Sequence, residues 1–234
     1  CECTYIFKID EKRIIITCPQ GIEQQQIKYQ NAHQCGYFEI LEDFKSKYKL
    51  TEFKQLDYGF DFYAARTFKD DKGRRILYGW MGVSESPYLV NQTSENGWKQ
   101  ALSIPRELRY KNNILCQKPI KELKNLRKNK KDILMNEIEK EIYNSVCFEL
   151  NITFNKDEDF KLLLREDCKI EYCIDNHIFK LSMGTCGDGR DSRSVQLKSL
   201  SEISIFSDTS SLEIFINDGV TVMTTRIFGD SDDI

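Results

Sequence analysis

Two aspartates lie in a segment crowded with aromatic residues, and side chains of these types at this spacing could do chemistry. Asp57 and Asp61 flank an aromatic cluster in the run DYGFDFYAARTFKDDKGRRILYGWMG, and Trp80 lies between two glycines near the end of that run. Carboxylates accept hydrogen bonds from sugar hydroxyls, and aromatic rings pack against the apolar faces of sugars. Asp57, Asp61, Tyr63 and Trp80 are therefore candidate carbohydrate-binding residues. The residue types alone also fit an ordinary hairpin whose aspartate caps a turn.

The elements that must position these side chains are two strands joined by a tight turn. Residues 62–68 are rich in aromatic and β-branched types, which favour a strand. The polar run 69–73 ends on glycine and predicts the turn, and residues 74–80 predict the returning strand.

This run and the later segments GWKQALSIPREL and SLEIFINDGVTVMTTRIF resemble glycoside hydrolase family 32 in order and spacing along nearly the whole chain. The bacterial sucrose-6-phosphate hydrolases and invertases of that family look most similar. The resemblance implies a five-bladed β-propeller followed by a β-sandwich. It also implies hydrolysis of the terminal β-fructofuranosyl bond of sucrose 6-phosphate or sucrose, with no metal or organic cofactor.

Hydrolysis with retention requires two carboxyl groups about 5–5.5 Å apart, one acting as nucleophile and the other as acid and base. The family's acid/base lies in a Trp-Glu-Cys-Pro motif, and the chain opens with Cys1-Glu2-Cys3-Thr4 at a fitting distance before the aspartate segment. The resemblance therefore makes Glu2 the candidate acid/base, although Cys1 replaces the tryptophan and Thr4 replaces the proline. The alternative is that Glu2 is a solvated surface residue.

The family's other two catalytic motifs do not occur in this sequence. The nucleophile motif Asn-Asp-Pro-Asn-Gly and the transition-state motif Arg-Asp-Pro are both missing, as if roughly the first half of the propeller were absent. We therefore expect a fragment that is inactive alone and that pairs with its missing N-terminal half or with a second copy. The alternative is a non-catalytic remnant, or a sugar-binding or interaction module.

The predicted domain organisation has three parts. Residues 1–118 contain short strands and turns, as expected for the C-terminal part of a propeller. Apolar residues at helical spacing predict a linker helix within residues 119–131. Residues 132–234 predict the β-sandwich, because residues 146–154 alternate strictly between apolar and polar types and Asn217-Asp218-Gly219 is a hairpin signal.

The sequence also predicts the surroundings of four charged residues outside the candidate site. Arg106 and Glu107 are expected to form a structural ion pair at the domain junction. Arg190 and Arg193 lie in a glycine- and charge-rich stretch, residues 184–194, that predicts a mobile loop. Arginines in such a loop are expected to be solvated, with binding of an anion as the alternative.

Composition excludes several classes of protein. The formal net charge of -3 gives no electrostatic footprint for nucleic acid. No apolar run approaches the ~20 residues of a membrane span, and no signal-peptide pattern is present at the start. Nine cysteines are scattered without a disulfide framework, and with only two histidines none has zinc-site spacing. Reduced thiols in the cytoplasm are the expectation.

Overall fold

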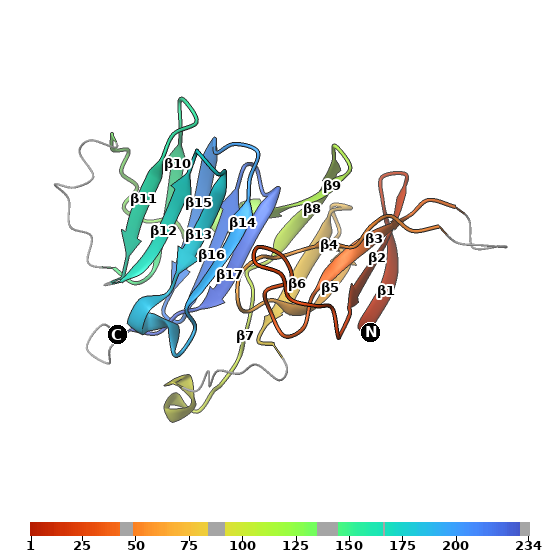
Figure 1. The fold of residues 1–234 in the computed structure, drawn as a ribbon, viewed down its shortest axis with the longest axis horizontal. Coiled ribbons are helices and arrows are strands. Elements are labelled where there is room, and N and C mark those ends of the chain that lie inside the picture. Colours follow the sequence, from red (N-terminus) through yellow and green to blue (C-terminus); the bar gives the residue numbers. More distant parts are fainter. Residues whose placement is uncertain (43–48, 84–91, 135–144, 166, 230–234) are drawn as a thin grey trace.

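The computed structural model describes residues 1–42, 49–83, 92–134, 145–165 and 167–229. Strands supply nearly all of the regular structure there, and they form four antiparallel sheets (Figure 1). The prediction of an all-β protein is confirmed. Within this described part of the chain, no helix has the length and apolar character needed to cross a membrane.

The first sheet is a meander that carries the candidate acid/base on its edge strand. Its strands follow the chain in the order β1 (Glu2–Ile9), β2 (Lys12–Cys18), β3 (Gly36–Ile40) and β4 (Lys54–Gln55). Alternation along β1 turns Phe7 and Ile9 into the core and leaves Ile6 50% exposed on the opposite face.

The second sheet contains the predicted hairpin. Its strands are β5 (Tyr63–Lys69), β6 (Arg75–Met81), β8 (Arg106–Lys111) and β9 (Ile114–Pro119), with β7 (Ala101–Leu102) paired to β6 after the 3-10 helix η1 (Gln92–Asn96). Asp70 accepts hydrogen bonds from the backbone N–H groups of Lys72 and Arg74, and Gly73 adopts a φ of 77°. The turn is therefore built by an aspartate and a glycine, as predicted. The first and second sheets, called here the N-terminal sheets, share one hydrophobic core that includes Phe7, Ile14, Phe62 and Leu77.

The two C-terminal sheets pack over a second core. One has the order β10 (Phe148–Thr153), β15 (Glu202–Asp208), β16 (Ser211–Ile216) and β17 (Thr221–Arg226), and the other has β11 (Phe160–Leu164), β12 (Cys168–Cys173), β13 (Ile178–Ser182) and β14 (Ser192–Gln196). Figure 1 shows them as neighbouring layers, and Ile170, Phe179, Ile205 and Ile214 from both sheets meet in the shared core. Asn217, Asp218 and Gly219 all take the left-handed conformation between β16 and β17, as the hairpin signal predicts.

One prediction for local structure holds in part and another needs correction. A short helix lies within the predicted range 119–131, but it is the 3-10 helix η2 (Lys121–Leu126), with no buried residue and with Leu126 74% exposed. Apolar residues at helical spacing do not stabilise a longer helix when no protein surface is available for them to pack against. The predicted loop at 184–194 instead contains the 3-10 helix η4 (Gly184–Gly187) and the start of β14.

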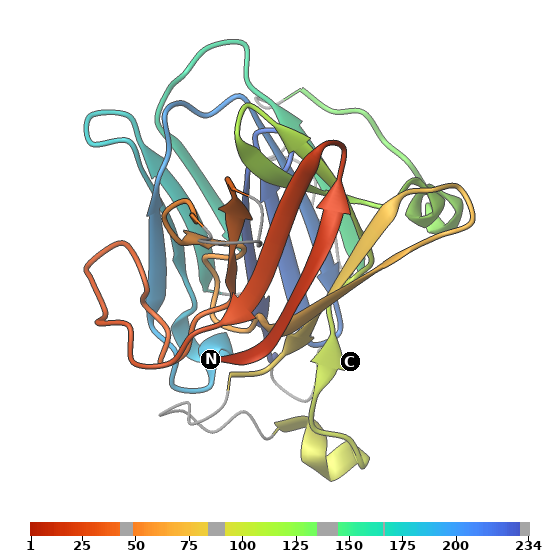
Figure 2. The same cartoon turned by 90° about the vertical axis from the view of Figure 1, so that its right-hand side faces the viewer.

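The aspartate segment joins the N-terminal sheets to the C-terminal sheets. Tyr58 N donates to Val222 O at 2.8 Å and Asp61 N donates to Thr224 O at 3.0 Å, so the segment runs along β17 like an added strand. A Cβ at Gly59 would lie 2.1 Å from Thr224 O, so only glycine permits this approach. Figure 2 shows the molecule from the side of β1 and β2, with the C-terminal sheets behind them.

Candidate functional site

Glu2 and Tyr63 meet where the first two sheets pack together. Glu2 begins β1 and Tyr63 begins β5, and Tyr63 Oη donates a hydrogen bond to Glu2 Oε2 at 3.1 Å. The Glu2 side chain is exposed, whereas Tyr63 is only 2% exposed. The carboxylate therefore faces solvent with a buried phenol behind it.

Backbone irregularities follow both of these residues. The ladder shifts register after Glu2 in β1 and after Tyr63 in β5. Cys3 and Ala64, the residues that come next, have positive φ values of 52° and 49°. A left-handed conformation is uncommon for residues other than glycine, and β-bulges that re-aim a side chain are frequent beside active sites.

The phenol of Tyr63 is held in its protonated state by its surroundings. Burial raises the pKa of Tyr63 well above its ordinary value, and Cys18 and the carboxylate of Glu2 add to the rise. Tyr63 is therefore a hydrogen-bond donor at neutral pH. Trp80 meets it edge-on with ring centroids 6.3 Å apart, and His33 lies on it with centroids 6.2 Å apart.

Trp80, which the sequence predicts to bind carbohydrate, is half-buried in the structure. It packs against the core of the N-terminal sheets, and its Nε1 donates to Gln100 Oε1 at 3.0 Å. The same ring borders Tyr63 across the β5–β6 ladder, where the two residues are directly paired. Trp80 thus combines a core contact with a position beside Glu2's partner.

Asp57 lies in the interior and is saturated by protein partners. Its carboxylate accepts hydrogen bonds from Gly59 N at 2.9 Å, Thr224 N at 2.8 Å, Thr224 Oγ1 at 2.5 Å and Arg106 Nη1 at 3.2 Å. Burial raises the pKa of Asp57, while Arg106 opposes the rise. These bonds give Asp57 a role in joining the two pairs of sheets, and contact with a sugar stays a prediction.

Asp61 occupies an equivalent position further along β17. It accepts hydrogen bonds from Arg226 N at 2.8 Å and Thr225 Oγ1 at 3.2 Å, and it forms an ion pair with Arg190 Nη1. Asp61 is 3% exposed and Arg190 is 2% exposed. The structure therefore does not place either aspartate against Glu2, and a substrate contact of Asp61 also stays a prediction.

The arginine predictions are corrected by these contacts. Arg106 lies at the predicted junction but pairs with Asp57 and Glu213 rather than with Glu107, because consecutive residues of β8 point to opposite faces. Glu107 pairs instead with Arg74 and Arg109. Arg190 and Arg193 are not solvated loop residues, since Arg190 bonds to Asp61 of the aspartate segment and Arg193 bonds to Asn31 of the β2–β3 connection.

His33 is a neighbour of the site that sequence reasoning missed as a site residue. It lies in the connection between β2 and β3, where it forms an isolated antiparallel bridge with Gln20. No motif around it signals a contact with Tyr63, because the contact arises only when β5 packs on the first sheet. Taken together, an exposed carboxylate, a buried phenol donor and two flanking rings can bind a polar ligand and exchange a proton with it.

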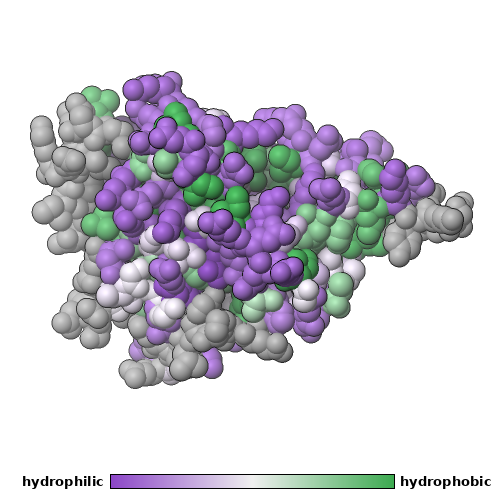
Figure 3. Space-filling view, viewed as in Figure 1, coloured by the Kyte–Doolittle hydropathy of each residue, from purple (hydrophilic) through white to green (hydrophobic). Residues whose placement is uncertain are grey.

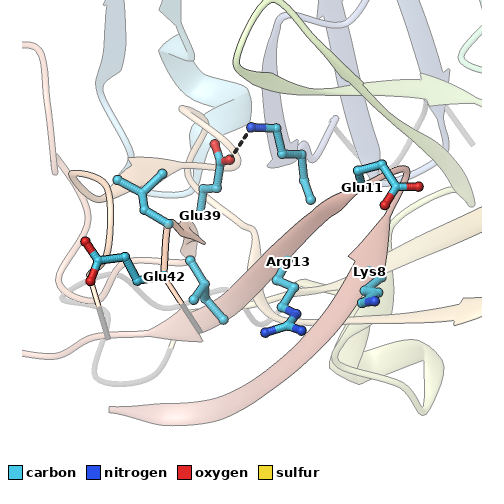
Figure 4. A pocket seen from close by; sticks show the side chains of 8 residues that line it. Lys8, Glu11, Arg13, Glu39 and Glu42 are labelled. Atoms are coloured by element: carbon cyan, nitrogen blue, oxygen red, sulfur yellow. Dashed lines mark hydrogen bonds and ion pairs between the residues drawn. The ribbon is translucent and has the colours of Figure 1, made fainter. Parts of the chain in front are cut away.

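A separate polar pocket lies at the far end of β1 from Glu2 (Figure 4). Lys12 Nζ is 2.6 Å from Glu39 Oε1 there, so these two charges compensate each other. The pocket is lined by Lys8, Glu11, Lys12, Arg13, Glu39, Ile40, Leu41 and Glu42. It shares no residue with the surroundings of Glu2.

Family models match both parts of the chain. The model described as glycosyl hydrolases family 32 N-terminal domain matches residues 1–119, and the model for the family's C terminal part matches residues 118–234.

Curated relatives and solved structures agree with these matches. Sucrose-6-phosphate hydrolase of Bacillus subtilis is 34% identical over 97% of this chain and 49% of the relative, and that of Staphylococcus xylosus is 36% identical over 98% of this chain and 49% of the relative. The structure of sucrose-6-phosphate hydrolase from Lactobacillus gasseri matches with a TM-score of 0.83 and 25% identity, over 99% of this chain and 50% of that one. The chain spans about half the length of the curated relatives it matches.

Proposed function

The chain belongs to glycosyl hydrolase family 32, and from that premise we propose that it carries the acid/base half of a retaining β-fructofuranosidase. The substrate class is sucrose 6-phosphate or sucrose, as the names of the relatives indicate. The observation that carries the proposal is the hydrogen bond from Tyr63 Oη to Glu2 Oε2. It joins the residue that matches the family's acid motif to a candidate sugar-site residue distant in sequence.

In this proposal Glu2 protonates the oxygen of the leaving group and then, as a base, activates the water that releases fructose. Tyr63 keeps the carboxyl oriented by donating to one of its oxygens, and Trp80 lines the sugar site beside Tyr63. The nucleophile comes from the half of the relatives that this sequence does not match. The chain alone is then inactive, because no glycosyl-enzyme intermediate can form without a nucleophile.

The finer architecture and the setting belong to the same proposal. The N-terminal sheets are the last blades of a five-bladed propeller, and the C-terminal sheets form the β-sandwich. The partner is the missing N-terminal half, or a second copy of the chain. The nine cysteines are free thiols, which suits a reducing, cytoplasmic compartment.

A second candidate is a non-catalytic remnant or a sugar-binding module. The specific observation in its favour is that neither Asn-Asp-Pro-Asn-Gly nor Arg-Asp-Pro occurs in the sequence. A remnant would retain the fold and the Tyr63–Glu2 contact but would not support turnover when the nucleophile is restored.

The test is to join the chain to the N-terminal half of the Bacillus subtilis relative and to measure fructose release. We expect release from sucrose 6-phosphate or sucrose, and a loss of about 10²–10⁴-fold in kcat for Glu2→Gln. The matched control is Glu11→Gln, an exposed glutamate in the turn after the same strand, which should keep full activity. A joined protein without activity favours the remnant, and full activity of Glu2→Gln removes Glu2 from the catalytic role.

A further inference from the structure

The connection between β2 and β3 links the surroundings of Glu2 to the C-terminal sheets. Gln30 Nε2 donates to Ser194 O at 2.7 Å, and Ser194 N donates to Gln30 Oε1 at 3.0 Å. The side-chain amide therefore pairs with the backbone of β14 as a neighbouring strand would. Figure 1 shows this connection lying between the N-terminal and the C-terminal sheets.

Asn31 and Arg193 form the centre of this link. Arg193 Nε and Nη2 donate to Asn31 Oδ1 at 2.9 and 2.8 Å, and Asn31 Nδ2 donates to Gly59 O at 2.9 Å. The Arg193 guanidinium also lies 3.8 Å from the centroid of the Phe60 ring. One arginine of β14 thus contacts the β2–β3 connection and the aspartate segment together.

Both of the segments held by Arg193 lead directly to Tyr63. Asn31 lies two residues before His33, whose ring contacts that of Tyr63. Gly59 and Phe60 lie in the aspartate segment, which leads into β5 at Tyr63. Asn31 is 8% exposed and Phe60 is 1% exposed, so neither segment can shift without opening buried packing. By contrast, Tyr63 is joined to Glu2 by one hydrogen bond, from Tyr63 Oη to Glu2 Oε2 at 3.1 Å.

We propose that Arg193 of β14 and Asn31 of the β2–β3 connection are positioning residues, which together hold Tyr63 against Glu2. The proposal rests on the proposed function in so far as Glu2 is the acid/base. Hydrogen bonds weaken steeply when distance and angle leave a narrow range, so a small displacement of the phenol would uncouple the pair. Arg193 acts through Asn31 and Phe60 and touches no reacting atom.

The experiment measures the coupling of Glu2 to Tyr63 in the chain itself, without turnover. The chain is labelled with ¹³C at the phenolic carbon of tyrosine, and Tyr63→Phe identifies the Tyr63 resonance. Glu2→Gln should move this resonance by several line widths at neutral pH, because it removes the charge that accepts the phenol's hydrogen bond. In the Arg193→Met background, Glu2→Gln should move it by less than one line width.

Two further variants separate positioning from general destabilisation. Arg165→Met is the matched control, because Arg165 donates to Thr209 O at 3.1 Å and Val146 O at 2.9 Å within the C-terminal part of the chain. It should lower the melting temperature and leave the coupling intact. Asn31→Ala provides a second test should Arg193→Met not fold, and Arg193→Lys, which keeps a cation near Phe60 without the forked donor, should restore only part of the coupling.

Full coupling in Arg193→Met, or in Asn31→Ala, overturns the proposal. Loss of coupling in the Arg165→Met control overturns it as well, because the effect would then follow stability alone. A failure of Glu2 as the acid/base would appear in the turnover assay of the joined protein and not in this measurement, so the two failures are distinguishable.

Discussion

Arg106 Nη1 lies 3.2 Å from Asp57 Oδ2, and neither side chain has appreciable contact with solvent. The same guanidinium donates to Glu213 Oε2 at 2.5 Å and to Thr224 Oγ1 at 2.6 Å. One arginine of β8 therefore binds the aspartate segment, β16 and β17 at a single point. Buried charges of this kind are tolerated only when they are paired and hydrogen-bonded, so each partner depends on the others.

Removing one partner of this cluster should destabilise the whole chain. Asp57→Ala leaves Arg106 and Thr224 with unmet donors, and we expect a loss of about 3–5 kcal/mol in the free energy of unfolding, measured by urea denaturation. Asp71→Ala, which changes an exposed aspartate of the β5–β6 turn, should alter stability by less than about 0.5 kcal/mol. An unchanged stability in Asp57→Ala, together with weaker sugar binding by the joined protein, would assign Asp57 to the sugar site instead.

The buried carboxylates of Asp57 and Glu213 share Arg106 as their ion-pair partner. The excess of negative charge predicts that the free energy of unfolding depends on pH. Burial raises the pKa of Glu213 above its ordinary value of 4.5, and Arg106 opposes the rise only in part. The folded state then retains a proton that the unfolded chain has released. Glu213 therefore contributes most to stability below its ordinary pKa, and this contribution falls as the pH rises through the raised folded value.

The comparison of the parent chain with Glu213→Gln isolates this effect. We expect the free energy of unfolding of the parent, minus that of the variant, to decrease from about pH 5 to about pH 8 in urea titrations. Ionisable groups that contact neither Glu213 nor Arg106 are common to both proteins and cancel in the difference, whereas Asp57 shares Arg106 and belongs to the measured effect. A difference that grows with pH would show that Arg106 outweighs burial and holds the Glu213 carboxyl below its ordinary pKa.

Local patterns explain which parts of the fold could be predicted. The β5–β6 hairpin, the strand β10 and the Asn217-Asp218-Gly219 turn follow from alternation and turn residues that are adjacent in sequence. Partners that arise from packing could not be found this way. Asp57 bonds to Thr224 and Gln30 bonds to Ser194, and only the assembled sheets bring these residues together.

The candidate site shows the same division. The family resemblance predicts Glu2 and the aromatic cluster predicts Tyr63 as site residues, but the contact between them depends on how the first two sheets pack. The sequence predicts Asp57 and Asp61 as sugar-binding residues but does not show their protein partners. Their burial against β17 could be inferred only from the tertiary structure, because sequence patterns report which face a residue occupies and not what covers that face.

The exposed face of the first sheet predicts self-association of the isolated chain. Ile6 pairs with Ile15 across β1 and β2, Ile15 pairs with Phe38 across β2 and β3, and Phe38 contacts Phe53 with ring centroids 5.3 Å apart. This row faces away from the core of the N-terminal sheets, and Figure 3 shows hydrophobic surface at this end of the molecule. Apolar patches of this kind mark interaction sites or aggregation hazards.

We expect Ile6→Lys to reduce the mass of the chain measured by light scattering after gel filtration. Leu163→Lys, a change to a 60% exposed leucine on β11, is the control and should leave association unchanged. A parent chain that remains monomeric at high concentration would contradict the prediction. Mixing with the N-terminal half of a relative should suppress association by covering the same row.

The last prediction concerns the phenol that supports Glu2 in the proposed enzyme. Tyr63→Phe removes the hydrogen bond to Glu2 Oε2 and retains the ring contacts with His33 and Trp80. A hydrogen bond to a charged group contributes about 1.5–3 kcal/mol, so kcat of the joined protein should fall about 10- to 100-fold. The loss should shrink for a fructoside with a good leaving group, because such a substrate needs little protonation from Glu2. Tyr78→Phe, which changes a half-buried tyrosine stacked on Phe68 in the same hairpin, should keep the parent rate. An equal loss with good and poor leaving groups would show that Tyr63 acts on sugar binding rather than through the proton of Glu2.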